Sequence, residues 1–168
     1  VFVDGRLSKV LSSAPGIANG TQAASLASAM ISDQELLQEH LARYAVVEDD
    51  GFTALNTAFL EDGAFINIPD GQNPASPINL VFITTGRSQP RVSYPRTLVV
   101  AGRNTKTTVV ESYIGLCQDP YFTDAVTEIV VGEGAEVEHY RLLMESDQAY
   151  HVGNCRVYQA LDSQYESA

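Results

Sequence analysis

Seven residues in the last quarter of the chain are the first candidates for chemistry, because they combine carboxylates and imidazoles with turn-forming glycines. They are Gly132, Gly134, Glu136, Glu138, His139, Glu145 and His151. The pattern is similar to a cupin metal site, in which several His and a Glu converge from facing strands. A cupin carries His-x-His, however, and the residue two positions before His139 is Val137. We therefore expect His139 to be a strand residue whose ring is satisfied by hydrogen bonds, with a cupin-like site as the alternative.

The two cysteines, Cys117 and Cys155, are the only other soft ligands or strong nucleophiles. They stand 38 residues apart and neither belongs to a C-x-x-C pair. A catalytic thiol needs a His partner, and the sequence does not place one beside either cysteine. We therefore expect two ordinary half-buried cysteines in a reducing compartment.

Carboxylates are abundant in the second half of the chain, and paired carboxylates can perform general acid–base catalysis. They are Glu111, Glu128, Glu133, Glu136, Glu138 and Glu145. Some parallel β-helix enzymes use such side chains on an outer face to cleave polysaccharides. A uronate substrate would also need cations, for which only the scattered Arg141 and Arg156 are available. We therefore expect the carboxylates to be solvated outer faces, with a polysaccharide enzyme as the alternative.

The charge balance excludes a protein that binds nucleic acid or anionic lipid through a cluster of cations. The 168 residues include 10 Lys and Arg against 21 Asp and Glu, a net charge of -11, and no cluster of cations to contact phosphates. No apolar stretch approaches the roughly 18–20 residues of a membrane span, and no G-x-x-x-x-G-K-[ST] phosphate loop is present. The chain begins with VFVDG and not with Met. We expect both of its ends to be cut from a longer protein.

Residues 1–62 have a helical pattern after a short strand at 1–3 and a turn at Asp4-Gly5. Ser32-Asp33-Gln34-Glu35 fits a capping box, and an apolar stripe follows it. A second helix is predicted from Asp49 or Asp50, with Gly63 as its C-terminal stop. Residues 21–30 are predicted to form a further short helix.

After residue 62 the apolar period changes to two and β-branched residues dominate, which predicts strands. The predicted strands are Ala64–Ile68, Asn79–Thr84, Thr97–Ala101, Thr107–Ile114, Thr127–Val131, Val137–Leu143 and Cys155–Gln159. Gly71, Gly102 and Gly132 recur at intervals of 31 and 30 residues, each between two strands. Such a period indicates a β-solenoid, with these glycines at equivalent corners. The inward positions should include Val99, Val109, Ile129, Val131 and Val137.

Four collinear stretches resemble the SufB/SufD family of the SUF iron–sulfur cluster assembly system. They are FTALNTAFLEDGAFINIPDG (52–71), VSYPRTLVVAG (92–102), TTVVESYIG (107–115) and YFTDAVTEIVVGEGAEVEHYRLLMES (121–146). The SufB branch shares the ALN-x-A…DG-x-F element of the first stretch, whereas Tyr-Pro-Arg (94–96) and Val-Glu-Ser-Tyr-Ile-Gly (110–115) are more similar to the SufD branch. The resemblance implies a mainly β fold, a right-handed parallel β-helix preceded by a short helical segment. It divides the chain into an N-terminal strand and helical segment (1–62) and the first coils of an incomplete β-helix domain (63–168).

The same resemblance implies a non-enzymatic scaffold that acts with SufB and the ABC-type ATPase SufC. The full complex assembles an iron–sulfur cluster at the SufB–SufD interface, in the cytoplasm or in the plastid of a plant or alga. The family segment that carries a proposed cluster ligand has no counterpart in this chain. We therefore expect no catalytic, cofactor-binding or metal-ligating residue here, and assign no cluster role to His139, His151, Cys117 or Cys155. A truncated β-helix exposes unpaired backbone groups, so we also expect self-association through its edges.

Overall fold

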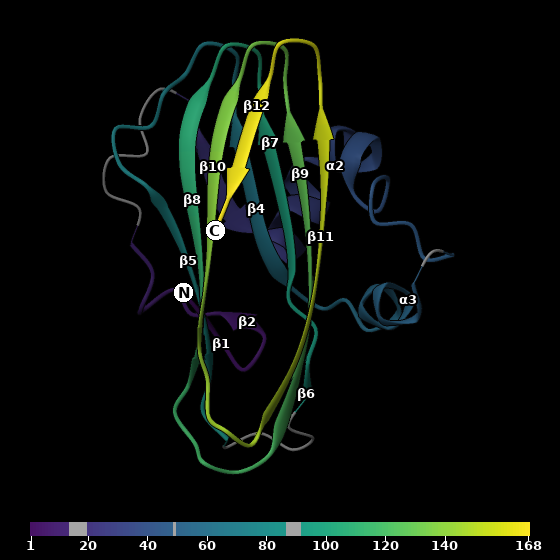
Figure 1. Ribbon diagram of the computed structural model, residues 1–168, viewed down its shortest axis with the longest axis vertical. Helices are drawn as coiled ribbons and strands as arrows, with labels where there is room; N and C mark the ends of the chain where they lie inside the picture. The colour runs from purple at the N-terminus through teal and green to yellow at the C-terminus, as the bar shows by residue number, and fades with distance from the viewer. Residues whose placement is uncertain (14–19, 49, 87–91) are drawn as a thin grey trace.

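Two sheets of mostly parallel strands face each other and form a flattened β-solenoid of about three turns, with short helices on one side (Figure 1). The computed structural model describes residues 1–13, 20–48, 50–86 and 92–168. The first sheet has the order β12-β10-β8-β5-β1-β2, and the second has the order β11-β9-β7-β4-β3, with β6 paired to β9. The predicted mainly β solenoid with a few helices is confirmed.

The N-terminal segment adds strands to both sheets. A two-residue turn at Asp4 and Gly5, both with positive φ, joins β1 (Phe2–Val3) to β2 (Arg6–Leu7), as predicted. β1 pairs in parallel with β5 in the first sheet, and β3 (Gln22–Ser25) pairs antiparallel with β4 in the second. The predicted helix over 21–30 is therefore wrong in its first half.

The first two helices do not use the predicted capping box at Ser32. Ser25 caps α1 (Leu26–Ser32), and α2 (Gln34–His40) follows Asp33 without a side-chain cap. The hydroxyl of Ser32 donates to the Asp33 carboxylate and does not cap the helix.

Asp50 caps α3 (Gly51–Ala58), as predicted, by accepting from the N–H and the hydroxyl of Thr53, whereas Asp49 lies outside the described residues. Gly63 begins β4 and does not stop the helix, which ends at Ala58 with Phe59 as its C-cap. None of the helices in the described part of the chain is long and apolar enough to cross a membrane.

All seven predicted strands are present. The solenoid strands are β4 (Gly63–Ile68), β5 (Ile78–Thr84), β6 (Val92–Ser93), β7 (Arg96–Ala101), β8 (Lys106–Gly115), β9 (Tyr121–Val131), β10 (Glu136–Met144), β11 (Ala149–Gln159) and β12 (Gln164–Ser167). β9 and β11 each begin six residues earlier than predicted. Their first halves contain Asp124, His151 and Asn154, so they lack the β-branched pattern that marks a strand.

One corner of the solenoid repeats in every turn. Four residues there have φ values between 54° and 70°, the left-handed region: Gly71, Asn104, Gly134 and Asp162. The backbone N–H of each of the first three donates to a carbonyl of the next turn, those of Arg103, Glu133 and Leu161. Of the predicted equivalent corners, Gly102 and Gly132 do stack, and a Cβ on Gly132 would lie 2.8 Å from the Ala101 carbonyl oxygen. Gly71 does not share their position, because the strand register aligns Pro69 with Gly102 and Gly71 with Asn104.

The space between the sheets is the main hydrophobic core. It includes all five side chains predicted to point inward, and each of them is at most 2% exposed. A second apolar cluster lies outside the second sheet, where Leu26, Ala29 and Leu37 of the helices pack on Phe65 and Leu98. The helices thus cover one outer face of the solenoid.

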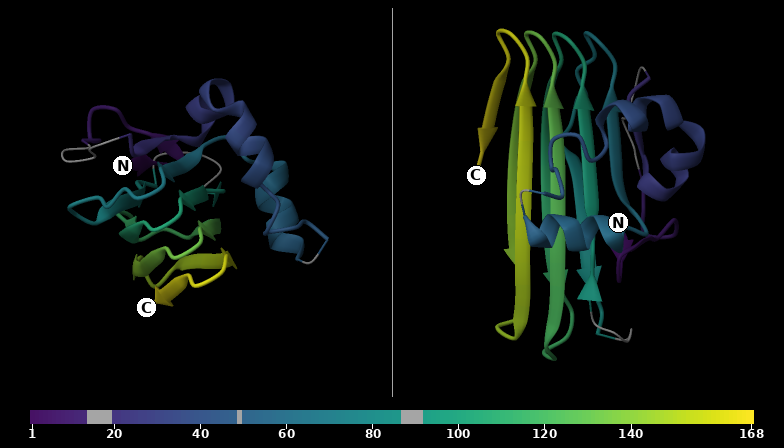
Figure 2. Two further views of the ribbon diagram at one scale, coloured as in Figure 1. Left: turned by 90° about the horizontal axis from the view of Figure 1, so that it is seen from above. Right: turned by 90° about the vertical axis from the view of Figure 1, so that its right-hand side faces the viewer.

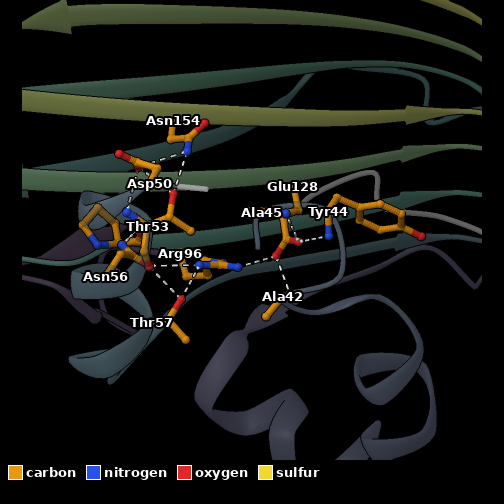
Figure 3. A network of polar contacts seen from close by, with 11 residues as sticks. Ala42, Tyr44, Ala45, Asp50, Thr53, Asn56, Thr57, Arg96, Glu128 and Asn154 are labelled. Carbon is orange, nitrogen blue, oxygen red and sulfur yellow. Dashed lines mark hydrogen bonds and ion pairs between the residues drawn. The ribbon is translucent and has the colours of Figure 1, made fainter. Parts of the chain in front are cut away.

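A buried ion pair joins this helical layer to the second sheet (Figure 3). Nη2 of Arg96 on β7 lies 2.6 Å from Oε1 of Glu128 on β9, and both side chains are at most 1% exposed. Three backbone N–H groups of the loop after α2, at Ala42, Tyr44 and Ala45, donate to the same carboxylate. Its desolvation is therefore offset by four donors.

Arg96 and its neighbours also hold α3 in place (Figure 3). Nη1 of Arg96 donates to the side-chain oxygens of Asn56 and Thr57. The amide nitrogen of Asn56 donates to the carbonyls of Pro95 and Asp124. Asn154 on β11 donates to the hydroxyl of Thr53. The helix is thus anchored by hydrogen bonds to several strands of the sheet.

We predict that Ile129→Ala lowers the free energy of unfolding by about 2–4 kcal/mol, because it leaves a cavity in a core with no exposed surface. Ile31→Ala is the matched control, since Ile31 is 80% exposed on α1. Urea unfolding of both variants measures the difference. Equal effects of the two substitutions would contradict the assigned core.

We predict that Glu128→Gln costs about 3–5 kcal/mol, because it leaves the buried Arg96 charge uncompensated. Glu133→Gln, at an exposed corner, is the control and should leave the unfolding free energy unchanged within about 0.5 kcal/mol. Amide hydrogen exchange should show α3 and residues 41–45 losing protection in the Glu128→Gln variant. Unchanged protection there would refute the anchoring role.

Candidate functional site

A polar cluster lies between the two sheets, where the core of the last turns ceases to be apolar. We call it the lumen cluster, and it consists of Glu111, Thr127, His139, Arg141, Cys155 and Tyr165. Strand register explains how it forms. β8 and β10 pair so that Glu111 stands beside Arg141 and Val109 beside His139, and β9 and β11 pair Thr127 with Cys155. Since alternate residues of a strand share a face, these side chains point into the same interior.

Glu111 is the centre of the cluster and is fully buried. Its Oε1 accepts from the hydroxyl of Thr127 at 2.9 Å, and its Oε2 lies 3.3 Å from Nε of Arg141 and 3.6 Å from Nε2 of His139. The hydroxyl of Tyr113 donates to Oε2 at 3.3 Å. Burial raises the pKa of Glu111, but its interactions with His139 and Arg141 outweigh burial and hold this pKa below its usual value. The carboxylate is therefore ionised.

His139 carries the matching positive charge. Its Nδ1 lies 2.9 Å from the hydroxyl of Tyr165, which in turn lies 3.9 Å from Sγ of Cys155. Burial lowers the pKa of His139, but interactions with Cys155 and Glu111 raise it by more. Together these effects raise the pKa to about 9. The ring is therefore an imidazolium at neutral pH. The cluster places a thiol, an imidazolium and a carboxylate in one enclosed interior, where a proton can be held or exchanged among them.

A second His–Glu pair lies near the other end of the same strands. Nδ1 of His151 is 2.7 Å from Oε2 of Glu145, and both side chains are about nine-tenths buried. The His151 ring packs edge-on against Tyr113, with centroids 4.7 Å apart. Tyr113 thus touches both pairs, because its hydroxyl reaches Glu111.

Gly153 makes room for this arrangement on the second sheet. A Cβ at this position would lie 2.9 Å from Nη1 of Arg141 and 3.4 Å from Nε2 of His151. Any larger residue would therefore require the tip of the Arg141 guanidinium to shift. A glycine inside a strand is the one sequence signal that marks this close approach.

The structure tests several predictions about the candidate residues. His139 is a strand residue, as predicted, and its Nδ1 pairs with the hydroxyl of Tyr165, but the ring is not fully satisfied: Nε2 has no hydrogen-bond partner among the described residues and lies 3.6 Å from the Glu111 carboxylate. The cupin alternative is wrong, because the strands stack in parallel as a solenoid and do not close into a barrel. The expectation that the carboxylates are solvated is wrong for Glu111 and Glu128, which have no exposed surface, and for Glu145. For Glu111 and Glu128, the sequence signal of burial was a charged residue within a run of β-branched residues.

The polysaccharide alternative loses one of its two candidate cations, because Arg141 points into the lumen and binds Glu111, whereas Arg156 donates to the side-chain oxygen of Asn154. Glu136 pairs with Lys106 at 2.6 Å on the outer surface. Cys117 and Cys155 are free and half-buried, as predicted. Cys155 does have a His neighbour, His139, which the sequence could not place. Among the described residues, no three His, Cys, Asp or Glu lie close enough to hold a metal ion.

Comparison with known proteins matches two family models to consecutive parts of the chain. The model described as "SufBD protein N-terminal region" matches residues 1–80, and the one described as "SUF system FeS cluster assembly, SufBD core domain" matches residues 82–168. Together they cover nearly every residue of the sequence.

Three curated relatives show the same similarity. An iron–sulfur cluster assembly SufBD family protein of Synechocystis is 36% identical over 139 residues, which is 76% of this chain and 31% of that protein. A SufBD family protein of Pyropia yezoensis is 30% identical over 77% of this chain and 26% of its own length. The iron–sulfur cluster assembly protein SufD of Escherichia coli is 26% identical over 90% of this chain and 33% of its own length. The chain thus spans a third or less of these relatives.

The raised pKa of His139 predicts a pH dependence of stability. Its value of about 9 in the folded chain lies above the 6.5 of a free histidine, so the folded state binds the extra proton between these values. The contribution of this proton is complete below about pH 6.5 and is lost as the pH rises through 9. We predict that the free energy of unfolding falls between pH 7 and pH 9.5, as measured by urea titration.

The variant His139→Gln should remove most of this fall, whereas His40→Gln, on α2 away from the lumen, should keep it. An equally steep fall in the His139→Gln variant would show that another group is responsible.

Proposed function

Because this chain belongs to the SufBD family of iron–sulfur cluster assembly proteins, we propose that it is part of a SufD-type scaffold subunit. In this proposal the subunit has no catalytic activity of its own and acts with homologues of SufB and of the ATPase SufC. The observation that carries the proposal is the pair of family models, which match residues 1–80 and 82–168 in the family's order. The similarity to Escherichia coli SufD over 90% of the chain supports the choice of branch.

The motifs that suggested the SufD branch have structural roles, which fits a scaffold. The stretch VSYPRTLVVAG contributes Arg96, the cation of the buried ion pair under the helices. The stretch TTVVESYIG contributes Glu111 and Tyr113, which lie in the lumen. These side chains hold strands and helices together and do not form an open substrate cleft.

The proposal treats the iron–sulfur cluster as cargo of the assembled complex, formed at the interface between the SufB and SufD subunits. It places the cluster ligands outside this chain, and the protein in the cytoplasm or in the plastid of a plant or alga. Two free cysteines are consistent with such a reducing compartment. We further propose a boundary at residues 62 and 63, where β4 begins the continuous stacking of strands.

The test uses the protein that contains this chain, in two arms. Tagged protein should co-purify the SufB and SufC homologues of the same organism under reducing conditions. Its gene should also restore growth of a bacterium that depends on the SUF system and lacks SufD, but should not rescue a strain that lacks SufB. Failure to co-purify either partner would overturn the scaffold proposal. Rescue of only the strain without SufB would overturn the choice of branch.

A further inference from the structure

The outer face of the first sheet carries an apolar area around Ser112, which stands between Leu142 and Val81, and we call this area the apolar face. It consists of Val81 and Ile83 on β5, Val110 and Ile114 on β8, and Tyr140, Leu142 and Met144 on β10. Strand register places Tyr140 beside Val110 and Met144 beside Ile114, which in turn stands beside Ile83. Tyr140, Leu142 and Met144 are 36%, 46% and 50% exposed. The apolar side chains of β10 are thus exposed to solvent, and those of β5 and β8 beside them are half-buried.

The described helices leave this face open. Figure 2 shows all three of them on the side of the second sheet, whose own outer side chains they cover. An uncovered cluster of this kind is unusual on a soluble protein and marks an interaction surface. The described helices therefore cover the outer face of the second sheet and leave the outer face of the first sheet uncovered.

Negative charge lies at one end of the apolar face. Glu136 and Glu138 precede Tyr140 on β10, and Glu166 on β12 stands beside Glu138. Lys106 neutralises Glu136 at 2.6 Å, whereas Glu138 receives only the hydroxyl of Thr108. Within the described part of the chain, no cation lies at ion-pair distance from Glu138 or Glu166. The surface therefore offers unpaired carboxylates next to exposed aliphatic groups.

A groove runs past these carboxylates. It has a volume of about 360 Å³ and is lined by the loop 73–77 together with Lys106, Thr108, Glu136 and Glu138. It is large enough for the long side chain of a lysine or arginine, whose stem would pack on Pro74 and Pro77. Its position next to Tyr140 joins the charged and the apolar parts into one surface.

The second sheet shows what kind of element closes such a face. There Leu26 and Leu37, from short helices, pack on the outward residues Phe65, Leu98 and Val130. A helix about 10 Å wide covers two to three strands spaced about 4.8 Å apart. The apolar face spans three such strands.

We propose that the outer face of β5, β8 and β10 is the docking site of an amphipathic α-helix from a partner protein, with aliphatic residues on one side and Lys or Arg beside them. The aliphatic side chains cover the apolar face, and the cations reach Glu138 in the groove and Glu166 beside it on β12. The net charge of -11 favours a cationic partner over a second copy of this chain. The proposal rests on the exposure and charge of this surface and not on the assignment of the chain to the SufD branch.

The test measures binding of a fluorescent 18-residue model peptide of Leu and Lys, with its leucines on one helical face, by anisotropy at physiological salt. A peptide with Glu in place of Lys is the control for charge. The protein variants are Leu142→Ser, Glu138→Gln and, as a matched control, Leu161→Ser in the exposed corner after β11. Circular dichroism and thermal unfolding establish that all variants are folded.

We expect the basic peptide to bind and the acidic one not to bind. Leu142→Ser should weaken binding at least tenfold and Glu138→Gln several-fold, with Leu161→Ser unchanged. Equal binding of both peptides, or equal effects of Leu142→Ser and Leu161→Ser, would overturn the proposal. So would a dimer in sedimentation that Leu142→Ser dissociates, because the occupant would then be a second copy.

Discussion

The carboxylate of Glu128 is the interaction on which the outer architecture depends. It lies in the middle of the second sheet, without exposed surface, and accepts hydrogen bonds from Arg96 and from three backbone N–H groups of one loop. A buried charge is tolerated only when its hydrogen-bonding capacity is used, and here four donors use it. Those donors come from a sheet strand and from the loop after α2, so this carboxylate joins two layers that also meet through apolar contacts.

The interior of the solenoid follows the same rule with different groups. Glu111 is as deeply buried as Glu128, but its partners are side chains, Thr127, Tyr113, Arg141 and His139, contributed by both sheets. The first turn has an apolar interior, in which Phe2, Ile66 and Phe82 meet, and the polar cluster begins only in the later turns. Both buried carboxylates therefore fix the relative positions of neighbouring elements, one outside the sheet and one inside it.

The sequence predicts well those parts of the fold that depend on hydrophobic periodicity. The strands around Val99, Val109 and Ile129 and the inward direction of these residues follow from alternation alone. It predicts poorly what depends on long-range partners. Ser25 caps a helix because β3 ends there, and no local pattern distinguishes it from Ser32. Glu111 was expected at the surface because its neutralising partner, Arg141, lies 30 residues away and becomes adjacent only through the strand register. The family resemblance identified the stretches that contain Glu111 and Arg141, but not the roles of these two residues.

The left-handed corner has a consequence for how the chain folds as it is made. At each corner, a backbone N–H donates to a carbonyl about 30 residues later in the sequence. The pairs are Gly71 with Arg103, Asn104 with Glu133, and Gly134 with Leu161. Each corner is thus completed by the turn that follows it in the sequence. On the ribosome, where the N-terminal part emerges first, the corner of the newest turn therefore bonds to water until the following turn supplies its carbonyl.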